Sequence, residues 1–260
     1  MAEKKPDGIG ETIKTIVYAL LIAGVIRTLF FQPFWIPSGS MKSTLLVGDF
    51  LFVNKMAYGY SQHSCPFSMC PFSGRILGSE PERGDIVVFK HPVSNVDYIK
   101  RLIGLPGDRI QMKAGQLYIN EVAAPLEPMG VFTEAKELQG PMGRTPRCSY
   151  SPVALNGGTC EKELFKETLP NGVEHAVLNI GTDYADDTGV YTVPAAHYFF
   201  MGDNRDNSQD SRYPRSTGGV GYVPFENLVG RADRVIFSSA GKSMLAFWTW
   251  RSDRFFKGLE

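Results

Sequence analysis

The chain has 260 residues, enough for one large domain or for one domain with a sizeable insertion. Lysine plus arginine and aspartate plus glutamate both number 27, so the formal net charge is zero. This balance argues against a nucleic-acid-binding protein, which usually carries a basic excess. The 27 glycines and 17 prolines, together with short β-branched and aromatic runs, favour a mainly β fold over long helices.

The first recognisable element is an uncharged apolar run, TIVYALLIAGVI, at residues 15–26. Its flanking charges, Lys14 and Arg27, have stems long enough to reach the two membrane interfaces. Aromatic residues typical of a membrane–water boundary follow, and no small-residue site for removal of a secretory leader lies downstream. We therefore expect an uncleaved transmembrane anchor at residues 13–33.

The basic residues around this run predict its orientation. Three lysines precede the apolar segment, whereas one arginine and one lysine follow it closely. Because positive charge favours the cytoplasmic side, we expect residues 1–12 to form a short cytoplasmic tail. The bulk of the chain then lies outside the cytoplasm.

The four cysteines form two pairs that are close in sequence, Cys65 with Cys70 and Cys148 with Cys160. Two local disulfides in an oxidising compartment fit this pattern, and free thiols are the alternative. Zinc is a weaker alternative, although His63 lies near the first pair. The two spacings differ from each other, and the chain has only four histidines.

After the anchor, short apolar runs bounded by polar turns predict strands, and the same texture returns after residue 190. Between them, about residues 121 to 190, the chain is turn-rich and charged, which indicates an insertion. The tail beyond residue 240 contains two of the three tryptophans. The expected units are an antiparallel β domain at 34–120 and 191–240, an inserted smaller subdomain at 121–190, and a membrane-proximal tail at 241–260.

Common catalytic signatures are absent from the sequence. A Ser-His-Asp triad needs a histidine as base, but none of the four lies in a telling motif. The chain also lacks the serine-hydrolase elbow, the zinc-protease helix motif and the nucleotide-binding loops. A serine can instead be activated by a lysine that burial keeps neutral.

Two stretches supply such a serine and such a lysine. In FWIPSGSMKSTL, residues 34–45, Ser38 and Ser40 flank a glycine shortly after the anchor. In VDYIKRLIGLPG, strand alternation places Lys100 and Arg101 on opposite faces, so one cation lies on a face that is not simply solvent. Lys100, flanked by Tyr98 and Leu102, is the candidate desolvated amine. An edge-strand lysine that reaches water is the alternative.

A third stretch, MGDNRDNSQDSRY at residues 201–213, is almost entirely polar. A solvated loop is the simplest interpretation. The near balance of its acidic and basic residues also fits a loop cross-linked by ion pairs that supports a site.

The segments PSGSM, YIKRLIGLPGD and GDNRDNSQDSR, in this order after an anchor, resemble the signature boxes of type I signal peptidase, the membrane-anchored bacterial leader peptidase. The resemblance runs from the anchor to about residue 237 and is weakest at 121–190. It implies a mainly β fold, no metal or cofactor, and cleavage after small residues in an A-x-A-like context. It also implies a single-pass protein of the bacterial inner membrane with its catalytic domain on the periplasmic side.

The resemblance also implies roles for single residues. Ser40 matches the nucleophile and Lys100 its general base. The Ser38 hydroxyl and the Ser40 backbone N–H match the oxyanion hole, and Ser208 matches a hydroxyl that hydrogen-bonds to the lysine and orients it. Four further residues match supporting positions: Arg101, Asp203, Asp210 and Arg212.

The expected partners are preproteins that carry signal peptides, together with membrane lipid. Nucleic acid is not expected, and we expect a monomer. Two alternatives remain at this point. One is a specialised Ser-Lys processing peptidase, and the other is a membrane-tethered β-rich scaffold that binds exported chains without cutting them.

Overall fold

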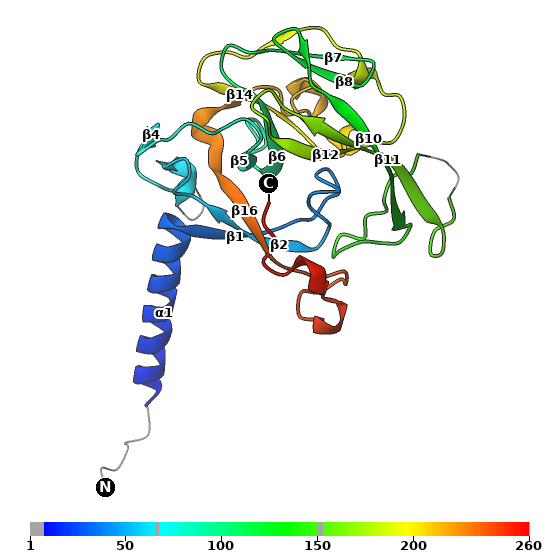
Figure 1. Cartoon of the computed structure of the whole chain (residues 1–260). Helices are drawn as coiled ribbons and strands as arrows, with labels where there is room; N and C mark the ends of the chain where they lie inside the picture. Colours follow the sequence, from blue (N-terminus) through cyan, green and yellow to red (C-terminus); the bar gives the residue numbers. More distant parts are fainter. Residues whose placement is uncertain (1–7, 66–67, 150–152, 260) are drawn as a thin grey trace.

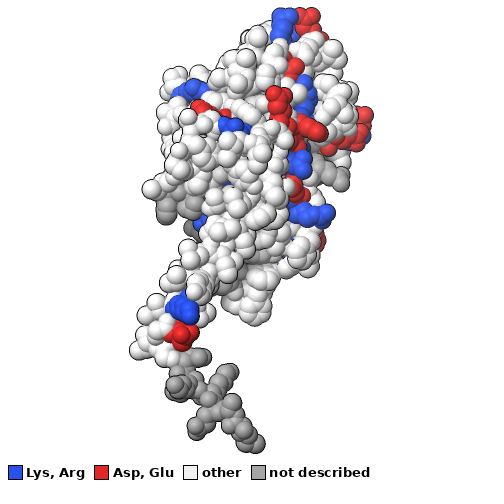
Figure 2. All heavy atoms as spheres, turned by 90° about the vertical axis from the view of Figure 1, so that its left-hand side faces the viewer, with Lys and Arg blue, Asp and Glu red and all other residues white. Residues whose placement is uncertain are grey.

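The structure, a computed structural model, describes residues 8–65, 68–149 and 153–259. In this part of the chain one long helix, α1 (Ile9–Leu29), projects from a mainly β body (Figure 1). Its 21 residues span about 30 Å, the thickness of a bilayer's hydrocarbon core, and none of them is buried. The helix is thus long and apolar enough to cross a membrane, and charged side chains are sparse along it (Figure 2). The expected fold class, a β body with one N-terminal apolar helix, is confirmed.

The helix ends earlier than the sequence predicts. Residues 31–33, assigned above to an anchor at 13–33, belong to strand β1 (Phe31–Trp35), which pairs antiparallel with β2 (Asp49–Asn54). Pro33 explains the difference, because proline disfavours helical backbone in the residue before it and is tolerated in an edge strand. The aromatic residues after the helix are therefore part of a sheet.

The main sheet contains seven strands in the order β1-β2-β16-β5-β6-β14-β15. It places the C-terminal strand between two N-terminal ones, so segments far apart in sequence share one core. Its remaining strands are β5 (Ile86–Lys90), β6 (Asp97–Gly104), β14 (His197–Met201), β15 (Val223–Pro224) and β16 (Leu228–Ser238).

Three smaller sheets complete the body. A four-stranded sheet consists of β13 (Tyr191–Thr192), β7 (Arg109–Lys113), β8 (Gln116–Ile119) and β9 (Val122–Ala123). A two-stranded sheet consists of β3 (Tyr60–Ser61) and β4 (Arg75–Ile76). A three-stranded sheet consists of β10 (Leu126–Ala135), β11 (Thr159–Thr168) and β12 (Glu174–Asn179).

The β10–β11–β12 sheet lies inside the expected insertion at 121–190. The first residues of that segment do not belong to the inserted sheet, because β9 pairs with β8 of the preceding sheet. The inserted sheet is also tied to the polar run, since Leu178 N donates to Asp203 O at 2.8 Å. The division of the chain into domains stays a prediction.

Both cysteine pairs form disulfides in the structure, Cys65 with Cys70 and Cys148 with Cys160. Of the alternatives left open above, the structure therefore contains the two local disulfides. The second one fastens the segment before β11 to the start of that strand.

The C-terminal segment folds back onto the main sheet. Arg254 forms an ion pair with buried Asp49 of β2, and Trp250 makes a bridge with Ser239. The segment between Ser239 and Trp250 carries exposed apolar side chains, among them Trp248, whose exposed fraction is 76%. Contact of this tail with lipid stays a prediction.

Candidate active site

The turn that carries Ser38 and Ser40 is anchored to the core by the apolar residues that follow it. Met41 and Leu45 are one helical turn apart, both are buried in the core, and Leu45 N donates to Met41 O at 2.8 Å. With these two side chains inserted, the serines lie at the rim of the core. Ser38 Oγ and Ser40 Oγ are 3.4 Å apart.

Lys100 meets this turn from the main sheet. It lies on β6 between β5 and β14, where nearly the whole strand is buried. Its Nζ is 2.6 Å from Ser40 Oγ and 3.1 Å from Ile99 O. The alternative of an edge lysine that reaches water is therefore wrong. The structure brings the sequence-predicted serine and lysine into direct contact.

Burial lowers the pKa of Lys100 from its ordinary value of 10.5 to about 8. The carboxylates of Asp210 and Asp203 raise the pKa, and the guanidinium of Arg212 lowers it, but desolvation outweighs these charges. A substantial fraction of this amine is thus neutral slightly above pH 7, as a base requires.

Histidine does not serve as the base for Ser40 in this structure, because Ser40 Oγ contacts Lys100. All four histidines lie in the described part of the chain, and none of them forms a hydrogen bond with Ser40 Oγ. His175 lies instead behind the polar run, 3.3 Å from Glu167.

The polar run at 201–213 is cross-linked by buried ion pairs, as its charge balance predicts. Arg101 forms two hydrogen bonds with the carboxylate of Asp203, both at 2.9 Å. Asp210 and Arg212 form a second two-bonded pair, also at 2.9 Å. Burial favours a high pKa for both carboxyls, but the facing arginine lowers the pKa in each case. All four predicted supporting residues therefore lie in two rigid pairs next to Lys100.

Ser208 differs from its predicted contact. Its Oγ is buried and has no hydrogen-bond partner within ordinary distance and angle limits in the described part of the chain, whereas Lys100 Nζ contacts Ser40 Oγ and Ile99 O. Ser208 does help to lower the pKa of Asp210, so its hydroxyl lies close to that carboxylate. The predicted hydrogen bond that orients Lys100 is thus not formed here.

Gly202 is required by the geometry, a point that the sequence analysis missed. A Cβ on this residue would lie 2.3 Å from Ser208 Oγ and 2.6 Å from Ser40 O. These distances are too short for any real contact, so only glycine lets the polar run approach the nucleophile turn.

Asn204 is a second residue that the sequence analysis missed. Its side-chain amide donates to Gly39 O at 2.9 Å, and its backbone N–H donates to Ser40 O at 3.1 Å. These bonds fix the two carbonyl groups on either side of the Ser40 N–H. The position of Asn204 inside the polar box was the only signal for this role.

Two cavities meet at Ser40. One, of about 630 Å³, contains the Ser40–Lys100 pair and is also lined by Phe34, Tyr98 and Ile99. The other, of about 420 Å³, lies on the side of Lys42 and Gln139. Ser40 thus lies between two cavities, which leaves space for a peptide chain on both sides of the bond that is cleaved.

The chain is similar to known proteins over most of its length. Residues 9–237 match the family described as signal peptidase, peptidase S26. The chain is 40% identical over 239 residues to "Signal peptidase I" of Rickettsia typhi, covering 88% of this chain and 80% of the relative. It is 39% identical over 235 residues to "Signal peptidase I" of Rickettsia prowazekii, covering 86% and 79%.

Among solved structures, a signal peptidase I from Enterococcus faecalis is 27% identical. That match covers 59% of this chain and 97% of the other, with a TM-score of 0.30. On the strength of the family match and the Rickettsia relatives, the chain belongs to the signal peptidase family, peptidase S26.

Proposed function

We propose that the protein is a membrane-anchored serine endopeptidase that removes N-terminal signal peptides from exported preproteins, with Ser40 as nucleophile and Lys100 as general base. The observation that carries this proposal is the 2.6 Å contact between Lys100 Nζ and Ser40 Oγ in a buried setting. Membership in the signal peptidase family supports the reaction and the substrate class.

The first half of the reaction forms an acyl-enzyme. Neutral Lys100 accepts the Ser40 hydroxyl proton, and Oγ attacks the carbonyl carbon of the residue before the scissile bond. The Ser40 N–H and the Ser38 hydroxyl donate to the developing oxyanion, and one such donor typically contributes about 2.7–4 kcal/mol. The tetrahedral intermediate collapses, the C–N bond breaks, and the leaving amine takes the proton from the Lys100 ammonium.

The second half releases the signal peptide. Neutral Lys100 takes a proton from water, and the hydroxide attacks the ester carbonyl in the same oxyanion environment. Collapse of this intermediate breaks the bond to Ser40 Oγ, which regains its proton from Lys100. The product is a carboxylic acid, which loses its proton to water and leaves as a carboxylate, and the Ser40–Lys100 pair returns to its starting state.

We also propose cleavage after small residues, an extracytoplasmic catalytic domain and lipid contact by the C-terminal tail. The apolar side chains of Phe34, Tyr98 and Ile99, which line the cavity at Ser40, support the first. Two disulfides support an oxidising side of the bacterial plasma membrane. The exposed Leu245, Phe247 and Trp248 support the third.

The test is cleavage of a detergent-solubilised preprotein by the full chain. Ser40→Ala should abolish cleavage and leave the thermal unfolding midpoint unchanged, because it removes only one oxygen. Appreciable cleavage by the folded Ser40→Ala variant would contradict the assignment of the nucleophile. Binding of the preprotein without cleavage by the wild type would favour the scaffold alternative.

A further inference from the structure

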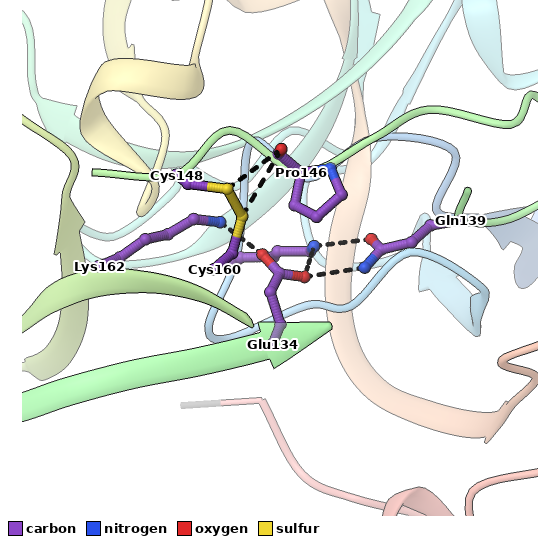
Figure 3. Close-up of a disulfide and its surroundings, with 7 residues drawn as sticks. Glu134, Gln139, Pro146, Cys148, Cys160 and Lys162 are labelled. Atoms are coloured by element: carbon purple, nitrogen blue, oxygen red, sulfur yellow. Dashed lines mark hydrogen bonds and ion pairs between the residues drawn. A yellow bond between two sulfur atoms is a disulfide. The ribbon is translucent and has the colours of Figure 1, made fainter. Parts of the chain in front are cut away.

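Lys42, two residues after Ser40, reaches the inserted sheet, where its head group contacts Glu134 and Gln139, two residues labelled in Figure 3. It is only 3% exposed. Its Nζ donates to the carboxylate of Glu134 and, at 2.7 Å, to Gln139 Oε1. A lysine is almost never fully buried without such partners, so these contacts determine where its head group can lie.

Glu134 is the centre of this cluster. It lies near the end of β10, and its second oxygen accepts a hydrogen bond from Lys162 of β11, which is 1% exposed. Gln139 Nε2 also donates to Glu134, at 2.8 Å. Burial by itself would raise the pKa of Glu134, but the two lysines lower it. One ionised carboxylate therefore compensates two buried ammonium groups.

The stem of Lys42 packs against the turn that forms the proposed oxyanion hole. A Cβ placed on Gly39 would lie 3.3 Å from Lys42 Cε, and Lys42 N donates to Gly39 O at 3.3 Å. From the other side, Asn204 holds the same carbonyl. Gly39, between Ser38 and Ser40, is thus held between the polar run and the Lys42 side chain.

The disulfide beside the cluster restrains the same region. Cys160 lies opposite Glu134 in the β10–β11 register, and it bonds to Cys148. The connection from β10 to β11, which carries Gln139, is therefore joined at Cys148 to the residue that lies opposite Glu134. This connection also lines the cavity on the Lys42 side of Ser40.

We propose that Glu134, assisted by Gln139, is a positioning residue for peptide cleavage: it holds Lys42 and thereby keeps the Ser38–Ser40 turn in the geometry that binds the oxyanion. The inference rests on the proposed function and gives the inserted sheet a role in it. The sheet acts through this turn, since no described residue of β10, β11 or β12 forms a hydrogen bond with the side chain of Ser40 or Lys100.

The first test is the steady-state kinetics of Glu134→Gln in the full chain. The amide keeps the shape of the side chain but loses the charge that holds Lys42. We expect kcat to fall roughly 10- to 100-fold, because small displacements of catalytic groups cost this much, with KM unchanged. The pH midpoint of kcat should stay at its wild-type value, since Glu134 does not contact Lys100.

Glu127→Gln is the matched control. Glu127 lies on the same strand and forms an ion pair with Lys166 of β11 at 3.1 Å. Its side chain is 62% exposed, and the carboxylate that holds Lys42 belongs to Glu134 instead. This variant should retain the wild-type kcat. Should Glu134→Gln fail to fold, Gln139→Ala removes a single neutral partner of Lys42, and kcat should still fall while the unfolding midpoint stays near wild type.

A second measurement separates oxyanion binding from general damage. A peptide boronate forms a tetrahedral adduct on a nucleophilic serine, whereas the cleaved signal peptide does not. Glu134→Gln should weaken boronate binding by the same factor as kcat and leave product binding unchanged. Equal losses for both ligands, or wild-type kcat in Glu134→Gln and Gln139→Ala, would overturn the inference. Neither result would restore or remove the Ser40 assignment, which depends on Ser40→Ala.

Discussion

Lys100 Nζ lies 2.6 Å from Ser40 Oγ, although the two residues are 60 positions apart, and they are only 4% and 7% exposed. Lys100 is held by the middle of the main sheet, and Ser40 by the insertion of Met41 and Leu45 into the core. The pair is therefore pre-positioned and largely shielded from water, two conditions that make an amine an effective base.

The lowered pKa of Lys100 predicts how activity depends on pH. Only the neutral amine accepts a proton, so kcat should be low at pH 6 and rise through one ionisation near the pKa of about 8. Lys100→Ala and Lys100→Arg should be inactive from pH 6 to 10, the latter because guanidinium stays protonated. A midpoint near 10.4, the value of free lysine, or activity in Lys100→Ala would contradict the base assignment.

Gly202→Ala should abolish cleavage. Its new methyl group would overlap Ser208 Oγ and Ser40 O, which forces the polar run away from the nucleophile turn. Overpacking of this kind typically costs about 1–3 kcal/mol of folding free energy. Gly181→Ala is the control, because a Cβ there meets nothing within 4 Å. Near-normal kcat in Gly202→Ala, measured beside this control, would show that the close approach is not needed.

Asp203→Asn should strongly destabilise the protein. It removes the negative charge that faces the buried Arg101 guanidinium, and breaking a buried ion pair in this way costs about 3–5 kcal/mol. Glu121→Gln breaks the exposed pair with Arg109 and should cost at most about 1 kcal/mol. Denaturant unfolding of both variants in the same detergent measures the difference, and similar losses would contradict this account.

The same ion pair predicts how stability depends on acid. The pKa of Asp203 in the folded protein lies below its ordinary value of 3.8, so the unfolded chain binds this proton more readily. The contribution is therefore present above about pH 4 and is lost as pH falls through the lower folded value. Asp203→Asn should show a flatter decline of unfolding free energy below pH 4 than wild type.

Deletion of residues 1–29 should leave a protein that still cleaves a short peptide substrate, since β1 begins at Phe31. Deletion of residues 1–35 should abolish that activity, because it removes β1 and exposes the edge of β2. Peptide hydrolysis by the two shortened proteins gives the comparison. Equal activity of the two would mean that β1 belongs functionally to the anchor.

The anchor, the mainly β class and the serine, lysine and polar-box candidates could be predicted from the sequence, because apolar runs, strand alternation and short motifs are local features. The sequence prediction assigned residues 31–33 to the anchor, whereas the folded chain pairs them with β2, and pairing between strands depends on tertiary structure. Only the folded chain showed that Ser208 forms no hydrogen bond with Lys100 and that Gly202 must lack a side chain. Lys42 and Glu134 are 92 positions apart, and no period or motif connects them. Their contact arises from the packing of the inserted sheet against the turn, which no local pattern encodes.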